Sequence, residues 1–143
     1  MKRMHIHVAV ANLGDSIRCY SAMFGNVEPT VLRSDYCKWE LMDPALNFAI
    51  SQRGVKPGVD HIGIQVETEA ELAEMNARFG AAQLPVEEQI GTTCCYARSD
   101  KAWTVDPQGV AWETFRTLEA APVYGQSHEQ SQAQSSVACC IPP

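Results

Sequence analysis

The sequence predicts an α+β protein built from paired βαβββ modules. The alternating segment His5–Val10 recurs as His61–Val66, so that two histidines stand at matching positions 56 residues apart. Each copy is followed by a helical pattern and by three short strands. An Asp-Pro turn precedes the last strand both times, at Asp43-Pro44 and at Asp106-Pro107. A repeat of this length is typical of paired units that bury a common core.

The first module is expected to span residues 1–53. Its opening strand alternates, so its aliphatic side chains share one face and both histidines, His5 and His7, share the other. Asn12 is the expected N-cap of a helix that Gly25 ends. Three short strands are expected at Val31–Arg33, Tyr36–Leu41 and Leu46–Ser51.

The second module, residues 59–118, follows a linker at Gly54–Gly58. Its opening strand again alternates, with His61 on the face opposite the aliphatic residues. Thr68 and Glu71 form the expected capping box of a helix that Gly80 ends. Three strands are expected at Val86–Gln89, Lys101–Val105 and Val110–Phe115.

The composition is that of an ordinary globular protein, with 45% hydrophobic and 20% charged residues. The formal net charge of -6 argues against nucleic acid or an anionic membrane surface as a partner. No apolar run approaches the length of about 20 residues that a membrane-spanning helix needs. The N-terminal residues do not form a secretory signal. We therefore expect one cytoplasmic domain over residues 1–118, with its cysteines as reduced thiols.

The character of the sequence changes after Leu118. Residues 126–136 are polar and of low complexity, which predicts disorder, so residues 119–143 are expected to form a flexible tail. The tail ends in a vicinal cysteine pair, Cys139-Cys140, where there is little to pack against. These thiols either capture a soft ion or are dispensable.

Strand alternation predicts a metal site in a cleft between the modules. The faces that hold His5 and His61 should line this cleft, and alternation in the last strand directs Glu113 toward it. Two imidazoles and one carboxylate with open positions form the facial triad of non-haem Fe(II) enzymes, and they also resemble a catalytic zinc site. His7 shares the face of His5, so it is either an alternative ligand or a supporting group, and we favour the supporting role.

Two adjacent cysteines, Cys94 and Cys95, offer a chelate for a soft ion. Adjacent cysteines form a strained disulfide. Neighbouring side chains of a regular strand point to opposite faces, so a shared ligand requires a loop or a bulge, which the preceding Gly91-Thr92-Thr93 favours. The alternative is that one cysteine is a small core residue, the role that we expect for Cys19 and Cys37.

These motifs resemble the vicinal oxygen chelate superfamily, which includes glyoxalase I, fosfomycin-resistance thiol transferases, bleomycin-binding proteins and extradiol dioxygenases. The matching residues span positions 1–117: His5 with Asn12-Leu13, then Asp60-His61-Ile62, then Asp106-Pro107-x-Gly109-x-x-x-Glu113. Within the superfamily the chain is similar to the cadmium-inducible and carbon–arsenic lyase group. That closer match consists of Gly91–Tyr96, Asp100-Lys101-x-Trp103 and the C-terminal cysteine pair.

The resemblance implies an enzyme that cleaves the carbon–arsenic bond of trivalent organoarsenicals, such as methylarsonite or aromatic arsenicals, and thereby confers arsenical resistance. It implies Fe(II) held by His5, His61 and Glu113, with Ni, Co, Mn or Zn as substitutes and dioxygen as co-substrate. Cys94 and Cys95 would bind the arsenic and position its bond to carbon.

The resemblance also suggests roles for residues around the cysteine pair. Arg98 and Lys101 would favour the thiolate form of the cysteines. Trp103 either belongs to the core or lines the cleft. Cys139 and Cys140 would pass arsenic or cadmium to the inner pair.

Two other functions stay open at this point. The vicinal cysteines are consistent with a non-catalytic cadmium- or arsenite-binding resistance protein. The same fold also supports a metal-dependent glyoxalase or glutathione transferase. However, Ala49 stands where glyoxalase I has a carboxylate, which disfavours that reaction. Monomer and homodimer are both compatible with the resemblance.

Overall fold

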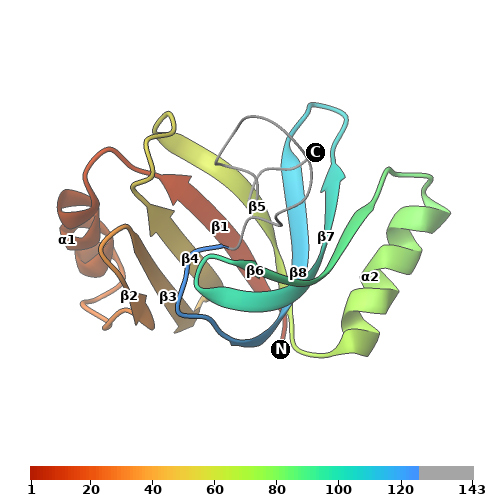
Figure 1. Cartoon of the computed structure of the whole chain (residues 1–143), viewed down its shortest axis with the longest axis horizontal. Helices are drawn as coiled ribbons and strands as arrows, with labels where there is room; N and C mark the ends of the chain where they lie inside the picture. The colour runs from red at the N-terminus through yellow and green to blue at the C-terminus, as the bar shows by residue number, and fades with distance from the viewer. Residues whose placement is uncertain (126–143) are drawn as a thin grey trace. The chain divides into compact units, whose positions relative to one another are not determined.

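The structure, a computed structural model, describes residues 1–125 (Figure 1). These residues form two compact units, the first comprising Met1–Gln65 and the second beginning at Val66. His128 and the predicted tail pair, Cys139 and Cys140, lie outside the described residues. Among the helices of residues 1–125, none is long and apolar enough to cross a membrane.

The first unit is a mixed sheet with one helix, drawn from red to yellow in Figure 1. Its elements are β1 (Arg3–Ala9), α1 (Leu13–Met23), β2 (Val31–Leu32), β3 (Tyr36–Met42), β4 (Ala45–Ser51) and β5 (Gly58–Val66). Strand β1 lies between β4, with which it is parallel, and β5, with which it is antiparallel. The antiparallel pairs β3–β4 and β2–β3 continue the sheet beyond β4.

Helix α1 packs on the aliphatic face of β1, as the sequence predicts. The Asn12 side chain caps the helix by accepting a hydrogen bond from the Asp15 backbone N–H at 2.9 Å. The core beneath the helix consists of apolar and aromatic residues: Leu13, Cys37, Trp39, Leu41, Phe48 and Ile50, with Ile6, Val8, Val10, Ile17, Tyr20, Phe24 and Leu46 packed against them. Because this core occupies one face of the sheet, the histidines of β1 face the other.

The two single cysteines of this unit have different environments. Cys37 is fully buried, and burial raises the pKa of its thiol to about 11, so it behaves as a small core residue as predicted. Cys19 was expected to pack as well, but it is exposed on α1. That prediction is wrong because position 19 lies outside the apolar stripe of the helix.

The second unit contains α2 (Glu69–Ala81), β6 (Glu87–Cys94), β7 (Ala97–Val105) and β8 (Ala111–Ala120). Strand β7 pairs antiparallel with both β6 and β8. The predicted capping box is present, because Thr68 and Glu71 each accept a hydrogen bond from the other's backbone N–H. The helix continues through Gly80, and the left-handed residue after it is Gln83, with φ 57°.

The strands of the second unit are longer than the sequence pattern predicts. Residues 91–94, expected in a loop, belong to β6, and residues 119–120, expected in the tail, belong to β8. Backbone pairing with β7 extends both strands beyond their apolar cores. The order of elements nevertheless confirms the α+β fold with two βαβββ modules, and the first strand of the second module, β5, pairs with β1.

Strand β6 contains a bulge that the Asp100 carboxylate stabilises. The β6–β7 register shifts between Gln89 and Thr92, and Gly91 within the shift has a φ of 63°, a conformation that favours glycine. Asp100 accepts hydrogen bonds from the Gly91 backbone N–H at 2.8 Å and from Arg116 at 2.7 Å. The Arg116 hydrogen bond is the main cause that lowers the pKa of Asp100.

Replacing Asp100 with asparagine should lower the free energy of unfolding by about 1–3 kcal/mol at pH 7, since a charge-assisted hydrogen bond is lost. The pKa of Asp100 is lower in the folded protein than in the unfolded protein. The contribution of its carboxylate to stability is therefore fully present above the unfolded pKa of about 3.9, and it is lost as pH falls through the folded pKa. In urea denaturation, the difference in the free energy of unfolding between wild type and variant should therefore shrink as pH falls below about 3.9. A difference that stays constant with pH would contradict this role.

Candidate active site

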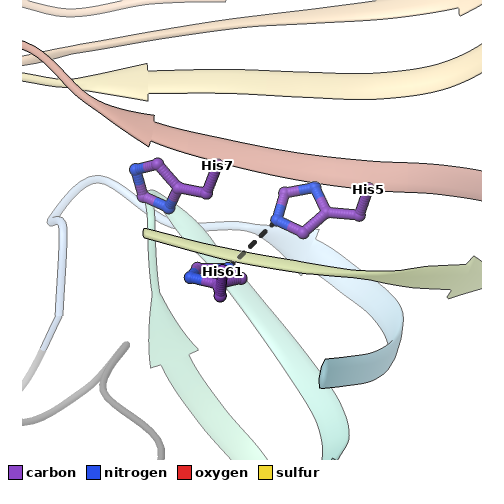
Figure 2. Close-up of side chains that lie close together, drawn as sticks. All are labelled: His5, His7 and His61. Carbon is purple, nitrogen blue, oxygen red and sulfur yellow. Dashed lines mark hydrogen bonds between the residues drawn. The ribbon is translucent and has the colours of Figure 1, made fainter. Parts of the chain in front are cut away.

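Strand β1 presents two histidines on the face that α1 does not cover, and β5 presents a third (Figure 2). His5, His7 and His61 are all buried, with at most 5% of their surface exposed. The two histidines of β1 lie two residues apart, which places them on one face of the strand. His61 is the direct cross-strand neighbour of His7. All three belong to the first unit.

A bulge in β5 orients His61. The β1–β5 register shifts after His7, where Val8 pairs with Val59, so Asp60 is the extra residue. Neighbouring residues of a regular strand would point to opposite faces, whereas a bulge redirects them. The Asp60 carboxylate can therefore accept a hydrogen bond from His61 Nδ1 at 2.7 Å. A carboxylate that holds a histidine this way is a common support for a metal ligand.

The other two imidazoles are held from β4. His5 Nδ1 lies 3.1 Å from the backbone oxygen of Asn47 and 3.2 Å from its side-chain oxygen. His7 Nε2 lies 2.9 Å from the hydroxyl oxygen of Ser51. Burying an imidazole is costly unless it is hydrogen-bonded, so these partners stabilise the buried positions.

The three histidines fit a metal ion. One nitrogen from each ring lies within 4.8 Å of the others, and the Nε2 atoms of His5 and His61 are 3.2 Å apart. Both Nδ1 atoms face oxygen acceptors and thus carry the proton, so in the neutral rings the two Nε2 lone pairs face each other. A cation between them removes the repulsion. Metal–nitrogen bonds of about 2.0–2.1 Å at roughly 90–105° separate two nitrogens by about 2.8–3.3 Å.

The two central cysteines form a hairpin turn between β6 and β7. Cys94 ends β6 and pairs with Ala97, and the two residues between them, Cys95 and Tyr96, have φ angles of 56° and 61°. Positive φ at both positions defines a type I′ turn. The Sγ atoms of Cys94 and Cys95 are 3.2 Å apart. The two cysteines lie at a turn, as predicted, although the turn follows Gly91–Thr93 rather than lying within it. That both sulfurs bind one ligand stays a prediction.

This turn is strained and is held by the segment after β8. Non-glycine residues in the left-handed region cost of order 1–3 kcal/mol each and cluster at ligand-binding sites. The backbone oxygen of Tyr96 accepts a hydrogen bond from Ala121 N–H at 2.7 Å, and Cys94 forms a β-bridge with Gly125. The Tyr96 and Tyr124 rings meet edge to face at 5.7 Å. These contacts hold the backbone of the turn that carries the two sulfurs.

Glu113, predicted as a metal ligand, lies on β8 in the second unit, where it forms a buried ion pair. Lys101 Nζ donates to Glu113 Oε1 at 2.7 Å, and the two side chains are only 4% and 6% exposed. The same ammonium lies 5.8 Å from the centre of the Trp103 ring, and Trp103 is buried. Arg98, the other predicted cation, forms an exposed ion pair with Glu119 at 2.6 Å.

Sequence reasoning assigned no role to Asn47, Ser51 or Asp60. Asn47 and Ser51 alternate on the face of β4 opposite Phe48 and Ile50, so two polar residues on one face of an otherwise apolar strand were an available signal. Asp60 belongs to the Asp60-His61-Ile62 motif, but only the bulge reveals its contact with His61.

The chain is similar to curated proteins over nearly its whole length. It is 36% identical to a probable trivalent organoarsenical cleaving enzyme of Bacillus subtilis, covering 100% of this chain and 93% of that protein. It is 44% identical to a trivalent organoarsenical cleaving enzyme of Bacillus sp. strain MD1, covering 82% and 74%. It is 30% identical to the cadmium-induced protein CadI of Mycobacterium bovis, covering 97% and 93%. No protein-family model matches the chain.

Solved structures support the fold. Homoprotocatechuate 2,3-dioxygenase from Arthrobacter globiformis matches 82% of this chain and 36% of its own, with a TM-score of 0.61 and 18% identity. The 2,3-dioxygenase LapB from Pseudomonas sp. KL28 matches 83% of this chain and 42% of its own, with a TM-score of 0.61 and 20% identity. The sequence relatives show that the chain belongs to the family of trivalent organoarsenical cleaving enzymes and CadI proteins.

Proposed function

We propose that this protein is an Fe(II)-dependent lyase that uses dioxygen to cleave the carbon–arsenic bond of trivalent organoarsenicals and release arsenite. The observation that carries this proposal is the pair of sulfur atoms 3.2 Å apart on a strained hairpin turn. The names of relatives 36% and 44% identical to this chain support the same substrate class.

The cysteine turn suits a trivalent arsenical with one carbon substituent. Such an arsenic atom carries two exchangeable hydroxyl groups. Once a small-molecule thiol has reduced the disulfide that Cys94 forms in the structure, the two thiols replace both hydroxyls, forming two sulfur–arsenic bonds and releasing two waters, while the carbon substituent stays on arsenic. Cys94 and Cys95 present both sulfurs on neighbouring residues, and the turn fixes their spacing, so the arsenic–carbon bond is held in one orientation.

His5 and His61 are the proposed imidazole ligands of the metal, because their Nε2 atoms face each other and their Nδ1 atoms are held by neighbours. Glu113 is the proposed carboxylate ligand, and His7, whose Nε2 contacts Ser51, is the supporting group. When bound, Fe(II) with open coordination positions supplies dioxygen activation. Asp60 keeps the His61 ring oriented toward the ion.

Iron-loaded protein mixed anaerobically with methylarsonite should release arsenite only after oxygen is admitted. Chromatographic separation of arsenic species before and after oxygen addition measures this directly. Arsenite release without iron or without oxygen would overturn the mechanism.

Glu113→Leu combined with Lys101→Met separates the enzyme from a passive thiol buffer, because it removes the carboxylate without leaving the Lys101 ammonium buried and unpaired. Cells that carry this variant should lose resistance to methylarsonite if the protein is an enzyme. Resistance that survives the substitution would instead identify binding by the cysteines as the protective activity.

A further inference from the structure

Strand β4 supports the candidate metal site although it contributes none of its ligands. It runs parallel to β1, with Asn47 paired to His5 and Ala49 paired to His7. Asn47 is 1% exposed and Ala49 is 1% exposed, so this face of β4 is buried. A polar side chain at such a position requires hydrogen-bond partners.

Every polar group of the Asn47 side chain has a hydrogen-bond partner. Its oxygen lies 3.2 Å from His5 Nδ1, and its backbone oxygen lies 3.1 Å from the same nitrogen. Its amide nitrogen donates to the side-chain oxygen of Gln65 on β5 at 3.0 Å. The Asn47 backbone oxygen can only accept, so His5 Nδ1 is the donor, and the end of the amide beside it must be an acceptor. The end that faces His5 is therefore the oxygen.

We propose that Asn47 is a positioning residue for His5: it holds the proton on Nδ1 and so directs the Nε2 lone pair toward the ion shared with His61. This inference rests on the metal site of the proposed function. A histidine whose Nδ1–H is fixed has one remaining nitrogen able to bind a metal, and its ring cannot rotate away without losing both hydrogen bonds. Asn47 thus serves His5 as Asp60 serves His61, but without adding a charge.

The test compares Asn47→Leu and Asn47→Asp by their affinity for Co²⁺, measured by chelator competition and by the visible absorption of bound cobalt. Asn47→Leu removes the side-chain acceptor, and Co²⁺ affinity should fall about tenfold. That is the low end of the usual range for losing such a support, because the Asn47 backbone oxygen remains. Asn47→Asp keeps an oxygen beside Nδ1, so it should stay within about threefold of wild type.

Cys37→Ala is a matched control, because it creates a cavity in the opposite face of the same unit and touches no histidine. It should lower stability while leaving Co²⁺ affinity and spectrum unchanged. If Asn47→Leu does not fold, Asn47→Ala allows the same comparison.

Three outcomes separate this inference from the proposed function. Wild-type affinity in Asn47→Leu, or equal losses in the leucine and aspartate variants, would overturn the role of Asn47 alone. Wild-type protein that binds no Co²⁺ would overturn the metal site and this inference with it. Cobalt binding that depends on Asn47, in a protein that releases no arsenite, would support the inference and overturn the lyase.

Discussion

Serine at both Cys94 and Cys95 should lower the rate of arsenite release from methylarsonite by at least about a thousandfold, because positioning alone can account for factors of about 10⁵ or more. Serine has the same shape as cysteine and a similar size, but it cannot form the sulfur–arsenic bonds. Each single serine variant should resemble the double variant, since one thiol leaves the arsenical free to rotate. Arsenite release under saturating iron and oxygen measures the effect.

Cys19→Ser provides the matched control, because Cys19 is an exposed thiol on α1, outside the turn. It should release arsenite at the wild-type rate. A double-serine variant whose rate of arsenite release stays within about tenfold of wild type would contradict arsenic capture by the turn. A tenfold loss of rate corresponds to only about 1.4 kcal/mol of transition-state stabilisation.

The fold could be predicted from the sequence because the repeat and the strand alternation agree. The matching histidine segments, the Asn12 cap and the Thr68–Glu71 capping box all occur where local chemistry requires them. Strand ends were predicted less well. The lengths of β6 and β8 depend on pairing with β7, and this pairing joins residues that no local pattern connects.

The site could be predicted only in part, because strand alternation places the histidines but not the residues that support them. Alternation predicted that His5, His7 and His61 lie together, and the structure groups these three histidines. Asp60 was missed as a partner of His61 because a regular strand would direct the two side chains apart, and only the register shift beside His7 brings them together. A bulge adds one residue to a strand without a required sequence, so alternation alone does not reveal it.

Lys101→Met should lower the free energy of unfolding of the metal-free protein by about 3–5 kcal/mol, because it leaves the Glu113 carboxylate buried without its ammonium partner. Lys101→Met combined with Glu113→Leu should recover most of the loss, since two apolar side chains of similar size can replace a buried ion pair. Urea denaturation in the presence of a chelator measures all three proteins.

Arg98→Met is the control for this prediction. Its ion pair with Glu119 is exposed, with side-chain exposures of 46% and 60%, so its removal should cost less than about 1 kcal/mol. Equal losses for Arg98→Met and Lys101→Met would mean that burial of the Lys101–Glu113 pair has no energetic consequence.

The Lys101 variant also tests whether Glu113 is a metal ligand. In the wild-type protein, Lys101 already neutralises Glu113, so a metal ion must compete with the ammonium for the carboxylate. In Lys101→Met the ion meets no competitor and supplies the missing positive charge, so saturating Co²⁺ should stabilise the variant more than wild type. If Co²⁺ stabilises both proteins equally, Glu113 does not bind the ion, and the ligands lie within the cluster of His5, His7 and His61.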